Sequence, residues 1–244
     1  MSERPPVGTI LALGLTQIIG YGTLYYSFSI LAPDMARDLN WSTEWIFAAL
    51  SAALLLGGLT APYLGRAIDH FGAGQVMTAG SAIAAAALIV CAYAPGKSGF
   101  VAALIVVEIA ANLVQYGAAF ALLVQASPRT AQRSITYLTL IAGFASTIFW
   151  PITTALHAHL SWQNVYLVFA ALNLLVCLPL HAWLSYGLAK GRAQKQAGTA
   201  QIVEGSLSPD VRQFGFKLMV VGFSLQSLVS AAILVHMVPL LSGL

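Results

Sequence analysis

Residues 134–189 read SITYLTLIAGFASTIFWPITTALHAHLSWQNVYLVFAALNLLVCLPLHAWLSYGLA, and this stretch decides the fold. From position 134 to position 189 it contains no Asp, Glu, Lys or Arg. A helix needs about 20 mostly apolar residues to cross a bilayer, so the stretch is too long for one crossing and suits two. The polar segment 157–164 is the natural turn between them. The stretch therefore predicts two membrane-spanning helices joined by a tight turn.

Five further apolar runs lie outside this stretch, and each is long enough for one crossing. They are residues 5–33, 45–65, 70–96, 98–128 and 218–244, and Glu108 is the single acidic or basic residue in them. The runs are continuous and do not alternate as the strands of a membrane β-barrel do. With 59% hydrophobic and 8% charged residues, the chain lacks the charged surface of a soluble domain. The sequence predicts an all-α membrane protein with seven spanning helices.

The basic residues set the expected orientation, because cytoplasmic loops carry an excess of Lys and Arg. With the N-terminus inside, nine of the 11 Lys and Arg residues lie on the cytoplasmic side and two outside. We therefore expect an integral, multi-pass protein of the cell membrane with a cytoplasmic N-terminus. The basic residues form no continuous face, so nucleic acid is not an expected partner.

A polar linker, rich in Gln, Gly, Ser and Lys, divides the chain unevenly. We expect a six-helix transmembrane bundle over residues 1–188 and a cytoplasmic central loop over 189–217. The seventh helix, residues 218–244, would begin a second bundle that is incomplete. Six helices, a long loop and one more helix are the arrangement expected for one part of a larger membrane protein.

Polar side chains follow one face of the fourth helix. Glu108, Asn112 and Gln115 stand at positions i, i+4 and i+7, and Tyr116 is beside them. Glu108 is the acidic residue deepest in any predicted span, and a carboxylate there is costly unless it faces a wet cavity or a partner. This face is either part of a substrate or proton site or a set of buried hydrogen-bond anchors.

The first and seventh helices carry similar polar faces. Gln17, Tyr21 and Tyr25 are spaced by four residues, as are Gln226 and Ser230. Gln17 and Tyr21 are expected to form a cavity wall. Tyr25 lies nearer the outer end, where it fits the aromatic belt at the membrane surface equally well.

Other patterns have structural explanations. Small residues spaced by four in the second helix predict close helix packing: Ala49, Ala53, Gly57 and Ala61. Pro151 predicts a bend in the fifth helix, and Pro179 lies in the sixth. His157 and His159 lack a third ligand, so we expect no metal and no cofactor. The sequence contains no motif of a hydrolase or an ATPase, so we do not expect an enzyme or an ATP-driven pump.

The segment between the second and third helices reads GRAIDHFGAGQ, residues 65–75. It resembles the signature of the major facilitator superfamily, G-x-x-x-D-[RK]-x-G-x-[RK]-[RK], at the place where the family carries it. Gly65, Asp69 and Gly72 match in register, whereas the basic positions are replaced by His70, Gly74 and Gln75. In the family this loop latches the cytoplasmic side shut. The resemblance implies gating roles for four residues: Gly65, Arg66, Asp69 and Gly72.

Two physical expectations accompany this loop. The carboxylate of Asp69 can cap the start of the third helix, where the helix dipole favours an anion. Arg66 is its natural ion-pair partner. Further residues, Leu39–Ser42 and Tyr26–Phe28, are similar to the monocarboxylate and oxalate/formate antiporter-like branch of the family.

The resemblance implies the N-terminal six-helix bundle of a facilitator plus the first helix of its second bundle, truncated before helices 8 to 12. It implies a secondary active transporter that moves a small solute, such as a monocarboxylate or another organic anion, by alternating access. Protons are the expected coupling ion. In this family helices 1, 4 and 7 help to line the cavity, and these are the helices with polar faces. The alternatives are a seven-helix, receptor-like binding protein and a truncated half that does not transport.

Overall fold

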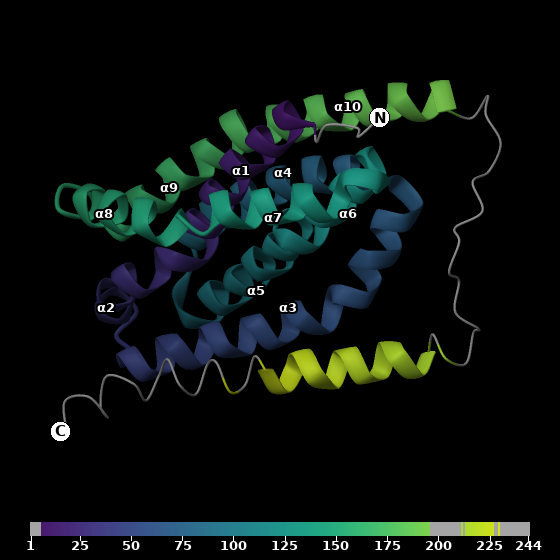
Figure 1. Ribbon diagram of the computed structural model, residues 1–244. Coiled ribbons are helices and arrows are strands. Elements are labelled where there is room, and N and C mark those ends of the chain that lie inside the picture. Colours follow the sequence, from purple (N-terminus) through teal and green to yellow (C-terminus); the bar gives the residue numbers. More distant parts are fainter. Residues whose placement is uncertain (1–5, 196–210, 212, 227–228, 230–244) are drawn as a thin grey trace, which may run out of the picture. The chain divides into compact units, whose positions relative to one another are not determined.

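The computed structural model describes residues 6–195, 211, 213–226 and 229, and it is drawn in Figure 1. The chain divides into two compact units, residues 1–197 and 198–244. The helices of the first unit are α1 (Val7–Tyr21), η1 (Gly22–Tyr26), α2 (Phe28–Asp38), α3 (Thr43–Phe71), α4 (Ala73–Ala92), α5 (Gly96–Val114), α6 (Tyr116–Ala126), η2 (Pro128–Thr130), α7 (Ala131–Ala142), α8 (Ala145–His157), α9 (Trp162–Leu172), η3 (Asn173–Cys177) and α10 (Leu178–Lys195).

The first unit contains six helical stretches long and apolar enough to cross a membrane, which confirms the six predicted crossings. They are Val7–Asp38, Thr43–Phe71, Ala73–Ala92, Gly96–Ala126, Pro128–His157 and Trp162–Gly187. The turn predicted within 157–164 is confirmed, because α8 ends at His157 and α9 begins at Trp162. Ser161 caps α9, since its hydroxyl oxygen accepts a hydrogen bond from the Asn164 amide at 3.4 Å.

The second unit is described over residues 211, 213–226 and 229, which are helical. Gln226 lies on this helix. The expected seventh span, 218–244, is therefore helical over its described part. Ser230 lies outside the described residues.

Two spans contain a short π-helical segment. The first span changes from α1 to the π-helix η1 and then to α2, and the sixth changes from α9 to the π-helix η3 and then to α10. The two segments touch: the Asn173 side-chain amide donates to the Thr23 hydroxyl at 3.0 Å, and that hydroxyl donates to the Ile19 carbonyl at 2.7 Å. Pro179 is the second residue of α10, just after η3, where the wider turns remove the need for the amide hydrogen that proline lacks.

The fifth span is interrupted where the sequence did not predict it. Its two helices, α7 and α8, are separated by Gly143 and Phe144. Pro151, for which a bend was predicted, lies inside α8, and the interruption of the span comes before it in the chain. Glycine disfavours the helical conformation, which explains why the interruption is at Gly143.

The bundle packs around α4, which contacts α5, α9 and α10. Five of its alanines are buried, and Gly80 allows a close approach: a β-carbon there would lie 2.6 Å from Leu113 Cβ. The small-residue stripe of α3 is confirmed as a packing surface over Ala49, Ala53 and Gly57, which are buried. Small residues let backbones come close where no water drives helices together.

Candidate functional site

A cavity of about 400 Å³ opens within the first unit. It lies among the first, second and fourth spans. Its walls are formed by Tyr21, Ala61, Leu64, Gly65, Ile68, Asp69, Asn112, Gln115, Tyr116, Gly117, Ala118 and Ala121. Four of the residues expected in a substrate cavity line it: Tyr21, Asn112, Gln115 and Tyr116. Two of the expected gating residues, Gly65 and Asp69, line it as well.

The cavity begins where α3 leaves the fourth span. At Gly57 the two spans are in contact, because a β-carbon there would lie 3.1 Å from Asn112 Nδ2 and 3.3 Å from Glu108 Cβ. One turn later Ala61 is exposed and lines the cavity, and Pro62 follows it inside the helix. A proline within a helix commonly bends it. Figure 1 shows α3 curving toward its C-terminal end.

The fourth span is broken at the cavity. Gln115 has extended backbone angles (φ −81°, ψ −166°), which ends α5 at Val114 and starts α6 at Tyr116. The Gln115 carbonyl accepts from the amides of Ala118 and Ala119, each at 3.1 Å. The first amides of a helix have no partner within it and give its N-terminus a partial positive charge. The break therefore presents the start of α6 to the cavity.

Gln17 supports this break from behind. Its side-chain amide donates to the Val114 carbonyl at 2.7 Å, and Gln17 is 1% exposed. A continuous helix would have paired that carbonyl with the Ala118 amide, which bonds Gln115 instead. The sequence predicted Gln17 as a wall residue, and the structure places it outside the lining, where it holds the wall in position. Within the described residues, its Oε1 atom has no hydrogen-bond partner.

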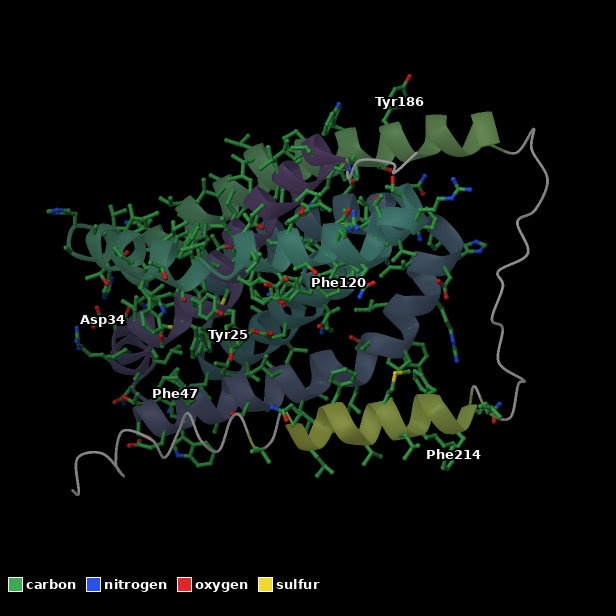
Figure 2. All side chains as sticks on the ribbon, viewed as in Figure 1. Tyr25, Asp34, Phe47, Phe120, Tyr186 and Phe214 are labelled. Carbon is green, nitrogen blue, oxygen red and sulfur yellow. The ribbon has the colours of Figure 1, made fainter. Side chains whose placement is uncertain are left out.

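Aromatic rings cover one side of the cavity. The Tyr21 and Tyr116 ring centroids are 4.8 Å apart, and Tyr116 stacks on Phe120 at 5.1 Å. The Tyr21 hydroxyl also lies beside the Tyr116 backbone amide. The row continues outward through Tyr26 to Tyr25, and Figure 2 labels its two ends, Tyr25 and Phe120. Tyr25 is 44% exposed and does not line the cavity, so it fits the aromatic-belt explanation.

Glu108 is buried away from the cavity lining. It is 5% exposed, and its Oε1 atom has no hydrogen-bond partner among the described residues. The carboxyl group lies near enough to the Tyr166 hydroxyl of α9 to interact with it electrostatically. It thus faces the interior of the bundle, one turn before Asn112, which reaches the cavity. The helical spacing placed both on one side of the span but did not show that α3 covers Glu108.

The expected gating residues surround the turn between α3 and α4. Gly72 connects the two helices with φ +89°, a conformation that favours glycine, so its place in the motif has a backbone cause. Asp69 belongs to the last turns of α3, is exposed and borders the cavity.

Two expectations for this turn were wrong. Asp69 does not cap α4, because it still belongs to the preceding helix; the first amide of α4, that of Ala73, donates to the Gln125 side-chain oxygen at 3.1 Å instead. Arg66 lies over the Tyr63 ring at 5.6 Å, and among the described residues it forms no ion pair with Asp69. Both residues are exposed.

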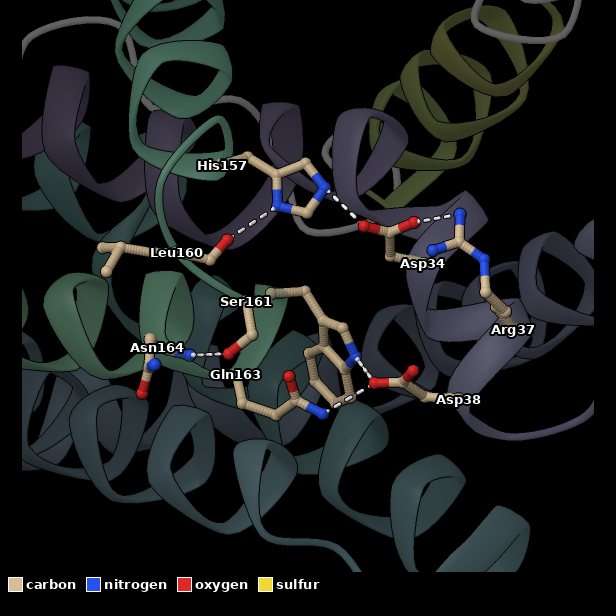
Figure 3. Close-up of polar contacts among 9 residues, drawn as sticks. Asp34, Arg37, Asp38, His157, Leu160, Ser161, Gln163 and Asn164 are labelled. Carbon is tan, nitrogen blue, oxygen red and sulfur yellow. Dashed lines mark hydrogen bonds and ion pairs between the residues drawn. The ribbon is translucent and has the colours of Figure 1, made fainter.

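The sequence missed a group of polar contacts at the other end of the bundle. Asp34 and Asp38 of α2 bind side chains at the end of α8 and the start of α9 (Figure 3). The histidines of this turn were considered only as metal ligands. The described part of the chain contains no group of three His, Cys, Asp or Glu residues that could hold a metal ion.

The fold and the cavity define a multi-pass helical membrane protein with a polar site between its spans. Residues 13–244 match the sequence model of a family described as the Major Facilitator Superfamily, and the chain belongs to this family. Proteins of the family are membrane transporters that carry small solutes and are not enzymes. No curated protein and no solved structure matches the chain significantly.

Proposed function

We propose that this protein is a secondary active transporter that moves a small solute by alternating access. The observation that carries the proposal is the cavity at the break of the fourth span, which is lined by polar side chains from separate spans. Transporters bind their substrates at such interrupted helices, where backbone groups are available near the middle of the membrane. Gly65 and Asp69, at the cytoplasmic end of this cavity, are the proposed gating residues.

The proposed substrate is a small organic anion such as a monocarboxylate. The first amides of α6 and the hydroxyls of Tyr21 and Tyr116 are donors that suit a carboxylate. The resemblance of Leu39–Ser42 to the monocarboxylate and oxalate/formate branch supports the same class. The Asp69 carboxylate would repel a negatively charged substrate. We therefore propose that the substrate carboxylate binds at the Gln115 end of the cavity, away from Asp69.

Protons are the proposed coupling ion, and Glu108 is their proposed carrier. It is a buried acidic side chain with an unpaired oxygen, next to the turn that carries Asn112. A carboxyl group within a membrane span commonly marks a proton or ion pathway. The domain organisation proposed for transport is the bundle 1–188, the cytoplasmic loop 189–217 and the helix 218–244, with the N-terminus in the cytoplasm.

Ligand binding to the purified 244-residue chain in lipid nanodiscs tests the proposal. Formate, acetate, lactate and oxalate are titrated calorimetrically, each beside its neutral amide. We expect at least one carboxylate to bind saturably and its amide to bind much more weakly. Asn112→Leu should weaken binding by about tenfold, the equivalent of one lost hydrogen bond. Tyr25→Leu, which alters an exposed ring outside the lining, is the matched control and should bind normally.

Equal binding of acid and amide, or no loss in Asn112→Leu, would contradict the proposed site. Uptake of the bound compound into proteoliposomes then separates the functions. Binding with uptake supports a carrier, whereas binding without uptake supports the receptor-like protein or the half that does not transport.

A further inference from the structure

The end of the bundle opposite the N-terminus carries a polar cluster that the transport proposal does not use. It joins three spans, as Figure 3 shows: Asp34, Arg37 and Asp38 of α2, His157 of α8, and Trp162 and Gln163 of α9. The distribution of Lys and Arg among the loops predicts that this end faces the outside of the cell. Asp34 and Asp38 are one helical turn apart, and each ties α2 to a different neighbour.

The contacts of His157 suit an imidazole ring that carries a hydrogen on each nitrogen. Its Nε2 atom lies 2.8 Å from Asp34 Oδ2, and its Nδ1 atom lies 3.2 Å from the Leu160 carbonyl oxygen. Both of these partners accept hydrogen bonds and neither donates. Only the imidazolium form of histidine has a hydrogen on each ring nitrogen. A neutral ring would turn one lone pair toward an oxygen, whichever tautomer it adopted.

His157 lies between a helix terminus and a carboxylate. It is the last residue of α8, and the C-terminus of a helix attracts a cation. Its side chain is 21% exposed and that of Asp34 is 29% exposed, so water screens this pair only in part. The competing cation Arg37 binds the other oxygen of Asp34 at 2.6 Å, but its side chain is 75% exposed. Other charged or titratable groups at this end, among the described residues, are Asp38, His159 in the same turn, and Lys97, which lies over the Trp41 ring.

The contacts that Asp38 makes with α9 do not involve a group that gains or loses a proton near neutral pH. Asp38 Oδ2 accepts from the Trp162 indole at 2.7 Å and from the Gln163 amide at 2.8 Å. Neither donor changes its charge between pH 5 and pH 8, whereas histidine does. The cluster thus combines one contact that responds to pH with one that does not.

We infer that Asp34 and His157 form a proton-binding site at the outer end of the bundle, whose proton ties the first span to the fifth. When the imidazolium releases its proton to water, the ring keeps one hydrogen: on Nε2 it leaves an uncharged hydrogen bond to Asp34, and on Nδ1 it leaves none. The tie between α2 and α8 is therefore strongest while the ring carries both hydrogens and is weakened when it carries one. The inference is independent of the substrate and of the cavity.

Hydrogen exchange of the full chain in nanodiscs tests this inference. The rate for peptides covering residues 28–38 is compared between the wild type and His157→Gln at about pH 5.5 and about pH 8.5, on either side of the range of histidine. Dividing the two rates at each pH cancels the intrinsic pH dependence of amide exchange. We expect the variant to exchange about three- to fivefold faster at the lower pH, as for an ion pair near a surface. At the higher pH the ratio of the two rates should lie closer to one.

Three further variants give controls. Asp34→Asn should reproduce His157→Gln, and His159→Gln, in the same turn, should behave as the wild type. Asp38→Asn should speed exchange equally at both pH values. Unchanged exchange of α4 peptides shows that each variant is folded. A wild-type-to-variant ratio that is the same at both pH values, or a pH effect that disappears in His159→Gln, would overturn the inference.

Discussion

Gly22 is the position where the packing of the first span can be tested most sharply. It begins the π-helix η1, and its backbone lies directly against the ring of Phe149 in α8. A β-carbon at this position would overlap three atoms of that ring. Gly20, two residues earlier in the same span, is the matched control, because a β-carbon there would meet no heavy atom within 4 Å.

The cost of Gly22→Ala follows from what surrounds the overlap. Phe149 is 3% exposed and packs against Phe169 at 6.1 Å, so its ring has no free space to enter. The backbone of η1 is held by the Thr23 hydroxyl, which bonds to the Ile19 carbonyl. Overpacking costs about 1–3 kcal/mol, and the better helix propensity of alanine returns about 1 kcal/mol. Gly22→Ala should therefore lose up to about 2 kcal/mol of unfolding free energy, whereas Gly20→Ala should gain about 0.5–1 kcal/mol.

Unfolding of the purified chain by sodium dodecyl sulfate in mild detergent, followed by circular dichroism, measures both variants. The combination of Gly22→Ala with Phe149→Leu adds a rescue, since the smaller side chain makes room for the methyl group. It should recover part of the stability that Gly22→Ala loses. If Gly22→Ala and Gly20→Ala unfold at the same detergent concentration, or if Phe149→Leu gives no relief, the close packing of η1 on α8 is not as described.

Two further changes test the site. Gln17→Met should destabilise the chain by about 1 kcal/mol in the same unfolding assay, because the Val114 carbonyl loses its donor. Thr16→Val is the control and should cost less, because the hydroxyl that it removes is bonded only within its own helix. Equal losses of stability in the two variants would argue against a supporting role of Gln17. Glu108→Gln keeps the shape of the side chain but cannot gain or lose a proton, so it should abolish or alter the pH dependence of uptake into proteoliposomes. An unchanged pH profile would exclude Glu108 from coupling.

Most of the fold was predictable because membrane crossing depends on length and apolarity alone. The six spans and the turn before Trp162 follow from runs without charged residues. The end of the first span was not predicted, because the uncharged run that defined this span ends at residue 33, directly before Asp34. The helix continues to Asp38, since these carboxylates find donors on α8 and α9. Counting apolar residues detects a helix but not the partners that let charges extend it.

The cavity was predictable only in part. Helical spacing placed Tyr21, Asn112 and Gln115 on inward faces, and they line the cavity. The same spacing could not separate them from Glu108, because burial depends on how close the neighbouring helix comes. The break at Gln115 was not predicted, since the residues around it are ordinary for a continuous apolar helix. The break depends on a tertiary contact: the Gln17 side chain, which belongs to another span, donates a hydrogen bond to the Val114 carbonyl that the break leaves without a helical partner.

The π-helix of the first span lets one helix serve two sets of neighbours. A regular helix advances about 100° per residue, so the extra residue of a π-turn rotates everything beyond it by about that angle. Before η1 the span presents Tyr21 to the cavity, and after it the span presents Asp34 and Asp38 to α8 and α9. Deleting one residue within 22–26 would restore regular geometry and turn the two carboxylates away from their partners. The length of this segment, more than its composition, sets the angle between the faces that the two halves of the span present to their neighbours.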